Sequence, residues 1–159
     1  DYDTAGIVGS PPGASADLID RHNCIVSSDL PRSVQSARAL GADFICLSSA
    51  LFREMNLPYF DHTPLRLPLK YWVILLRSLW FLGFSKNTES ISNAKARAKL
   101  ASERLIDLAT EHHSVLFVGH GFLNHYIARE LRGNSWVGPR SPGKRYWEFA
   151  TYSSDSSER

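Results

Sequence analysis

Apolar residues in this chain occur either in short runs or in longer stretches with helical spacing. The short runs predict strands of a few residues at 24–26, 44–47 and 114–118, and the alternating residues 145–152 predict a last strand. The continuous apolar run at 114–118 is typical of a strand that is buried on both faces. The longer stretches predict helices, at 31–40, 69–84, 89–112 and 122–131. Strands that alternate with helices are typical of a layered α/β sheet. We therefore predict a single α/β domain over residues 1–152, followed by a disordered polar tail at 153–159.

The composition is that of an ordinary globular protein, with 43% hydrophobic and 21% charged residues. The formal net charge of +2 is too small to indicate a nucleic-acid partner. Cys24 and Cys46 lie in apolar runs and are interpreted as reduced core residues. Because nothing suggests a disulfide framework, a reducing compartment is favoured, and we expect a cytoplasmic protein.

The most apolar stretch, residues 71–82, contains Arg77 and is shorter than the roughly 20 residues that a membrane-spanning helix needs. We therefore predict no membrane span, and a helix that is buried or lies at an interface. Trp72, Leu76 and Trp80 are spaced four apart and share one face of this helix. That face is expected to pack on the rest of the domain or on a second copy of the chain, in a homodimer.

Polar residues suited to anion binding lie in two predicted strand-to-helix turns. The first turn, residues 27–32, brings Ser27 and Arg32 to a helix start, and the second places His120 between two glycines after a strand. Ligands of open α/β sheets bind at the carboxyl ends of strands, where helix N-termini favour anions. We take Ser27, Arg32 and His120 as candidate phosphate-binding residues. The alternatives are a capped helix with a surface arginine, and a glycine-lined turn whose histidine bonds locally.

Glu54, a few residues after the second predicted strand, could act as a general acid if a pocket surrounds it; otherwise it is a solvated carboxylate. The second turn is not a dinucleotide-binding fingerprint, because Asn124 replaces the third glycine. The sequence also lacks a Gly-x-Ser-x-Gly elbow, a P-loop and a pair of histidines four apart. We therefore expect no metal and no organic cofactor.

Taken together, these motifs resemble the histidine phosphatase superfamily, which includes phosphoglycerate mutase. Residues 27–37 are similar to the family's second-arginine motif, and residues 115–121 to its late histidine motif. Glu54 lies where the family's acid is expected, and residues 88–90 open a long helix that contains Arg97. The resemblance covers most of the chain. It implies a layered α/β/α sandwich of the phosphoglycerate mutase type.

By this resemblance, Arg32 and His120 contact the phosphoryl group, and Glu54 protonates the leaving oxygen. The family's nucleophile is a different histidine, in an Arg-His-Gly turn after the central first strand, and this sequence contains no Arg-His-Gly. Residues 21–23, Arg-His-Asn, are a poor substitute, because they precede a predicted strand and lack the glycine.

The central N-terminal strand of the family is therefore expected to be missing from this chain. The sequence begins at Asp1, and Met55 is its only methionine, so we expect the domain to be N-terminally incomplete. The missing strand is predicted to lie between the strands at 25–26 and 115–118. An Arg-His-Gly encoded upstream of Asp1 would favour an enzyme.

Two functions are compatible with these residues. The first is a phosphomonoester hydrolase or mutase-like protein that acts through a phosphohistidine, inactive as the chain stands because the nucleophile is absent. The alternative is a non-catalytic protein on the same fold, either a binder of a phosphate ligand or an oligomeric scaffold. The expected ligand is phosphate or a phosphorylated small molecule, whose identity the sequence does not determine. Residues 56–84 are expected to cover the site.

Overall fold

The computed structural model describes residues 18–60, 67–143 and 145–154. The chain divides into two compact units, one made of Asp1–Glu54 and Ala98–Arg159 and the other of Met55–Arg97. The long helix α4, Ile91–His112, begins in the second unit and ends in the first. The structure confirms the predicted α/β class with a parallel sheet.

The first unit is built on a parallel sheet of three strands. β1 (Cys24–Ser28) lies between β2 (Leu47–Ser49) and β3 (Val115–Val118). Val26 in β1 is the register partner of both Leu47 and Phe117. All residues of β1 are buried, because β1 has a hydrogen-bonded neighbour on each side.

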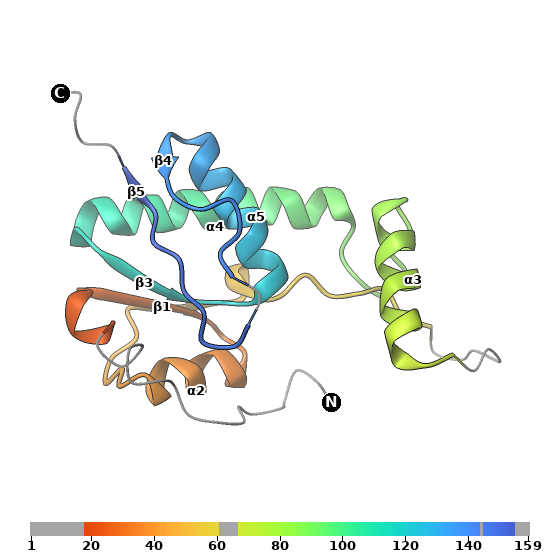
Figure 1. The fold of residues 1–159 in the computed structure, drawn as a ribbon, viewed down its shortest axis with the longest axis horizontal. Coiled ribbons are helices and arrows are strands. Elements are labelled where there is room, and N and C mark those ends of the chain that lie inside the picture. Colours follow the sequence, from red (N-terminus) through yellow and green to blue (C-terminus); the bar gives the residue numbers. More distant parts are fainter. Residues whose placement is uncertain (1–17, 61–66, 144, 155–159) are drawn as a thin grey trace. The chain divides into compact units, whose positions relative to one another are not determined.

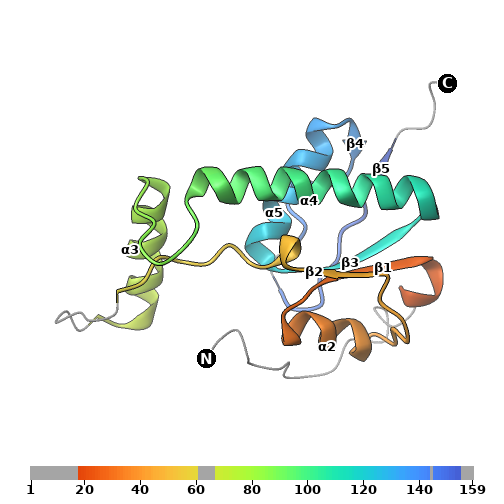
Figure 2. The same ribbon diagram turned by 180° about the vertical axis from the view of Figure 1, so that it is seen from behind.

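Helices lie on both faces of this sheet, as Figures 1 and 2 show from opposite sides. α2 (Pro31–Ala39) covers one face. α5 (Gly121–Gly133) and the C-terminal part of α4 cover the other. Two 3-10 helices, η1 (Ile19–Arg21) and η2 (Ala50–Phe52), precede β1 and follow β2, respectively. The layered arrangement places the starts of α2 and α5 at the carboxyl ends of β1 and β3.

Different apolar clusters hold the two faces of the sheet. Ile25, Ala37 and Ala42 are buried together on the α2 side, with Leu116 and Val118 packed against them. Because successive residues of a strand point to opposite faces, the alternate side chains of β1 and β3 point to the other face of the sheet. There the fully buried ring of Phe52 contacts Phe117, with 5.1 Å between the ring centroids.

Strand ends and strand exposure differ from the sequence predictions. The second strand lies at Leu47–Ser49, later than the predicted 44–47. β3 is only partly buried along its length, although its apolar run predicted a strand buried on both faces, because β3 pairs with β1 alone among the described strands. No strand forms over residues 145–152. Instead, β5 (Ser153–Ser154), in the segment predicted to be disordered, pairs antiparallel with β4 (Trp136–Val137); residues 155–159 lie outside the described residues.

In this structure the place expected for the missing strand, between β1 and β3, is closed. β1 and β3 pair directly over four residues, from Cys24 beside Val115 to Ser27 beside Val118. Their backbone groups are therefore satisfied by one another, and no slot for a further strand lies between them.

Met55–Arg97, the second unit, contains α3 (Leu69–Phe81). Trp80 is fully buried, and its indole N–H donates to the Glu89 carbonyl at 2.8 Å. Trp72 and Leu76, on the same predicted face, are half-buried. Of the three residues of the predicted face, only Trp80 is therefore fully buried. Large apolar side chains elsewhere on the helix are exposed, among them Leu69, Tyr71, Val73, Ile74, Leu75 and Phe81. None of the helices in the described part of the chain is long and apolar enough to span a membrane.

Burial makes Cys24 a poor nucleophile. The Cys24 side chain is fully buried, and desolvation, together with the neighbouring Cys46 thiol, raises the pKa of the Cys24 thiol to about 12. The thiolate is the reactive form, so the folded protein should hold this thiol protonated and unreactive at neutral pH. Unfolding would return its pKa toward 9.0, so the contribution of Cys24 to stability should be lost as the pH rises from about 9 toward 12.

Thiol labelling tests this burial. In a Cys46→Ser variant at pH 8, we expect no labelling of the folded chain by a water-soluble thiol reagent, and labelling of one thiol after denaturation. The wild-type chain, in which Cys46 is only half-buried, provides the comparison. Fast labelling of the folded Cys46→Ser variant would show that Cys24 is accessible.

Candidate active site

A buried hydrogen bond joins the turns that end β1 and β3. The hydroxyl of Ser28, the last residue of β1, lies 2.6 Å from Nε2 of His120. Ser28 is fully buried, and His120 is 8% exposed. A hydrogen bond in such a desolvated place fixes the orientation of the imidazole ring. The residues contributing to it are 92 positions apart in the sequence.

Ser33, a residue of α2, makes two hydrogen bonds at the same end of the sheet. Its hydroxyl accepts from the Ser28 N–H at 3.2 Å and donates to the Val118 carbonyl at 2.6 Å. Ser33 is itself buried, at 3% exposure. The hydroxyl therefore bridges the ends of β1 and β3, which sets the distance between the two turns that carry Arg32 and His120.

Arg32 lies in the first turn of α2, directly after Pro31. Proline suits this position, since its fixed φ matches the helix and the N–H that it lacks would have no partner there. Arg32 is half-buried, and its Nε and Nη2 atoms are shielded from solvent. The structure thus places Arg32 and His120 at the ends of neighbouring strands, as the sequence predicted.

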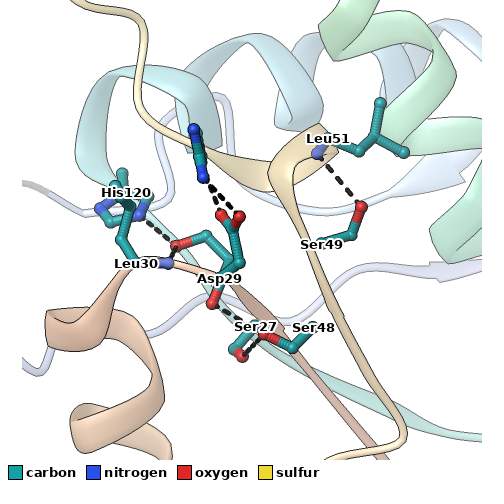
Figure 3. Close-up of polar contacts among 9 residues, drawn as sticks. Ser27, Asp29, Leu30, Ser48, Ser49, Leu51 and His120 are labelled. Carbon is teal, nitrogen blue, oxygen red and sulfur yellow. Dashed lines mark hydrogen bonds and ion pairs between the residues drawn. The ribbon is translucent and has the colours of Figure 1, made fainter.

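Ser27 does not lie at His120. Its hydroxyl contacts the Ser48 hydroxyl at 3.5 Å, and Ser48 in turn donates to the Ser28 carbonyl at 3.3 Å (Figure 3). Adjacent residues of a strand point to opposite faces, so Ser27 and Ser28 cannot both serve the same site. The serine that contacts His120 is Ser28, which the sequence reasoning missed.

Glu54 is held at the start of α5. Its carboxylate accepts from the Leu123 N–H at 2.9 Å and from the Phe122 N–H at 3.2 Å. His120 is the N-cap residue of this helix and makes no side-chain cap bond, so Glu54 supplies the capping oxygens from a distant segment. The positive end of the helix dipole favours the carboxylate there. Glu54 and His120 are therefore brought to the same helix terminus.

An ion pair lies beside these residues at the end of β1. Asp29 follows Ser28 directly, and its carboxylate accepts from Nε of Arg53 at 2.7 Å and from Nη2 at 2.6 Å. The Arg53 guanidinium holds the pKa of the Asp29 carboxyl below its ordinary value. Figure 3 shows Asp29 and His120 at the end of β1.

The glycine before His120 is required by close packing. A Cβ atom on Gly119 would lie 2.3 Å from the Phe117 ring and 2.5 Å from Oδ1 of Asn124. Any side chain at this position would push the Phe117 ring or Asn124 aside. A glycine is therefore needed for the β3-to-α5 turn to place His120 where Ser28 can reach it.

Comparison with protein families decides the assignment of the chain. The model of branch 1 of the histidine phosphatase superfamily matches residues 16–146 of the 159. The chain belongs to the histidine phosphatase superfamily. This finding confirms the resemblance seen in the sequence motifs.

Solved structures agree in fold with this superfamily member. The protein of open reading frame Rv3214 from Mycobacterium tuberculosis aligns over 87% of this chain and 76% of its own, with a TM-score of 0.58 and 14% identity. A structure described as mycobacterial hydrolase 1 aligns over 87% of this chain and 79% of its own, with a TM-score of 0.51 and 18% identity. At these identities the likeness concerns the fold. No curated protein matches the chain.

In this histidine phosphatase superfamily member, the other motif residues make contacts with partners other than Ser28 and His120. His22 precedes β1, and its Nδ1 is 2.5 Å from the Leu18 carbonyl, so it lies at the opposite end of the strand from Ser28. In the second unit, Glu89 forms an ion pair with Arg97 through both carboxylate oxygens. No group of three or more potential metal-ligating side chains occurs in the described ranges.

Proposed function

We propose that this histidine phosphatase superfamily member is a phosphomonoester hydrolase or mutase-like protein that binds the phosphoryl group with Arg32 and His120. The observation that carries the proposal is the buried Ser28–His120 hydrogen bond of 2.6 Å, which fixes the imidazole at the carboxyl ends of paired strands. Open α/β sheets bind their ligands at such places, and helix starts there favour anions. Phosphate or a phosphorylated small molecule is the ligand of matching charge.

Each residue has a distinct part in the proposed reaction. Arg32 and His120 stabilise the charge on the phosphoryl oxygens. By the resemblance of the sequence motifs, the group that attacks phosphorus is a histidine of an Arg-His-Gly turn, which this sequence does not contain; its attack would form a P–N bond while the P–O bond to the leaving group breaks. Glu54 gives its proton to the leaving oxygen, and the N–H groups of Phe122 and Leu123 stabilise the carboxylate that remains. Water would then attack phosphorus while the Glu54 carboxylate takes its proton, and the P–N bond breaks, which releases phosphate and restores the protonated Glu54.

Phosphate binding without catalysis is the second candidate function. The sequence of 159 residues contains no Arg-His-Gly, the motif that carries the superfamily's nucleophile by the resemblance of the sequence motifs. Arg32 and His120 would then hold a phosphate ligand that is not turned over. A scaffold formed by several copies would use the exposed apolar residues of α3, such as Ile74, which is 63% exposed.

Binding of inorganic phosphate tests the assignment of Arg32. A hydrogen bond to a charged group contributes about 1.5–3 kcal/mol, so Arg32→Ala should weaken phosphate binding roughly 10- to 100-fold. Isothermal titration calorimetry at constant ionic strength gives the two affinities. The matched control is Arg38→Ala, because Arg38 is exposed in the last turn of the same helix.

The control distinguishes a built site from general charge attraction. We expect Arg38→Ala to bind phosphate as the wild-type chain does. Equal losses in both variants would indicate unspecific electrostatic attraction, which salt would screen. Wild-type affinity in Arg32→Ala would remove Arg32 from the proposed site.

A further inference from the structure

Arg53 and Glu54 are neighbours whose side chains contact two different parts of the first unit. The Arg53 guanidinium contacts both oxygens of Asp29, directly after β1. The Glu54 carboxylate contacts the first N–H groups of α5, at Phe122 and Leu123. The backbone at Arg53 is extended, so successive side chains point to opposite sides. The segment is thus held between the end of β1 and the start of α5.

The approach to this segment is fixed locally by η2. Ser49 caps η2 by accepting from the Leu51 N–H at 3.2 Å (Figure 3), and the Arg53 N–H donates to the Ala50 carbonyl at 3.1 Å. Phe52, the last residue of η2, is fully buried against Phe117. These contacts fix the backbone up to Arg53, whereas the direction of residue 54 depends on contacts beyond the end of η2.

The Asp29–Arg53 ion pair has a geometry that fixes the orientation of the Arg53 side chain. Two parallel N–H···O bonds fix both the plane and the direction of a guanidinium, which a single contact does not. The Arg53 and Asp29 side chains are 52% and 32% exposed, and ion pairs at such exposure contribute little to stability. The hydrogen bonds from the Arg53 guanidinium hold the pKa of the Asp29 carboxyl below its ordinary value. The contribution of the pair therefore lies in orientation.

We propose that Asp29 and Arg53 are positioning residues, which hold the Glu54 carboxylate on the first N–H groups of α5 beside His120. This inference rests on the proposed function, in which Glu54 is the acid of the phosphoryl transfer. Loss of the Asp29–Arg53 pair would leave Glu54 in the chain but release it from the helix start, away from the position of the leaving oxygen.

The amide proton shifts of Phe122 and Leu123 measure this placement directly. An N–H that donates to a carboxylate resonates further downfield than one that donates to water. We expect Glu54→Gln to move both signals upfield at pH 7, which assigns the effect to the carboxylate. Arg53→Leu should reproduce most of that upfield change, although Glu54 is intact. Asp29→Asn should act in the same way and serves as a second variant should Arg53→Leu fail to fold.

Two further variants separate positioning from a general effect of charge. The exchange of the two charges, Asp29→Arg with Arg53→Asp, should restore the downfield signals. The matched control is Lys99→Leu, which removes an exposed ion pair of 3.9 Å with Glu103 on α4 and should leave both signals unchanged. Unchanged Phe122 and Leu123 signals in folded Arg53→Leu would overturn the proposal. Equal changes in Lys99→Leu would overturn it as well.

Titration of the wild-type sample with phosphate shows whether the positioning role or the proposed function has failed. If Arg53→Leu loses the downfield signals and the wild-type chain binds no phosphate, the positioning role holds and the proposed function fails. If the wild-type chain binds phosphate and Arg53→Leu keeps both signals, the positioning role alone fails.

Discussion

Replacement of Phe52 by alanine should destabilise the folded chain by about 3–5 kcal/mol, the range measured for large aromatic residues removed from cores. The Phe52 side chain is fully buried, and its ring contacts Phe117 at 5.1 Å between centroids. The substitution would leave a cavity between η2 and β3 and loosen the residues that lead into Arg53 and Glu54. The loss is a large part of a typical domain stability of about 5–15 kcal/mol.

Equilibrium unfolding in urea provides the measurement, with Phe44→Ala as the matched control. Phe44 is 73% exposed, so its removal should change the free energy of unfolding by no more than about 0.5 kcal/mol. Similar losses in the two variants would show that Phe52 is not part of the core. A loss in Phe52→Ala alone would establish that the segment before Glu54 is anchored by packing on β3.

The second large effect concerns catalysis. The 159-residue chain should hydrolyse a chromogenic phosphate ester no faster than its His120→Ala variant, because its sequence contains no Arg-His-Gly to supply the nucleophile. Removal of a nucleophile costs about 10⁶-fold in kcat in a well-studied hydrolase, which leaves only residual catalysis. Steady-state rates of the purified chain, with and without added phosphate as a competitor, provide the measurement.

Two controls make this result decisive. Turnover by the wild-type chain that is lost in His120→Ala would contradict the prediction and establish an enzyme in the chain as it stands. Turnover that is lost in His22→Ala would assign the nucleophile to the Arg-His-Asn sequence, against its place at the start of β1. Phosphate binding without turnover in any variant would support a ligand-binding protein.

The local parts of the site could be predicted from the sequence. The Pro31 start of α2 and the Gly119-His120-Gly121 turn before α5 lie where residue pattern alone placed them. The long helix predicted at 89–112 is observed as α4, Ile91–His112. Helix periodicity, proline at a helix start and glycine in a tight turn depend on residues a few positions apart, so a sequence contains all that is needed to recognise them.

Strand pairing could not be predicted in the same way. The apolar run of β3 predicted a strand buried on both faces, but the fully buried strand is β1. The residues 145–152 alternate in polarity and form no strand. A strand needs a hydrogen-bonding neighbour, and which segments become neighbours depends on the whole sheet and not on the segment itself.

The partners in the site were decided only by the tertiary structure. The sequence favoured Ser27 as a phosphate ligand, whereas Ser28 contacts His120, because a shift of one residue along a strand changes the face of the sheet. Glu54 finds its N–H donors 68 and 69 positions away, and Arg53 finds Asp29 24 positions away. Local sequence thus determined which turns carry the polar groups. Only the folding of distant segments onto one sheet determined which of those groups meet, since hydrogen bonds and ion pairs depend on distance in space rather than on separation along the chain.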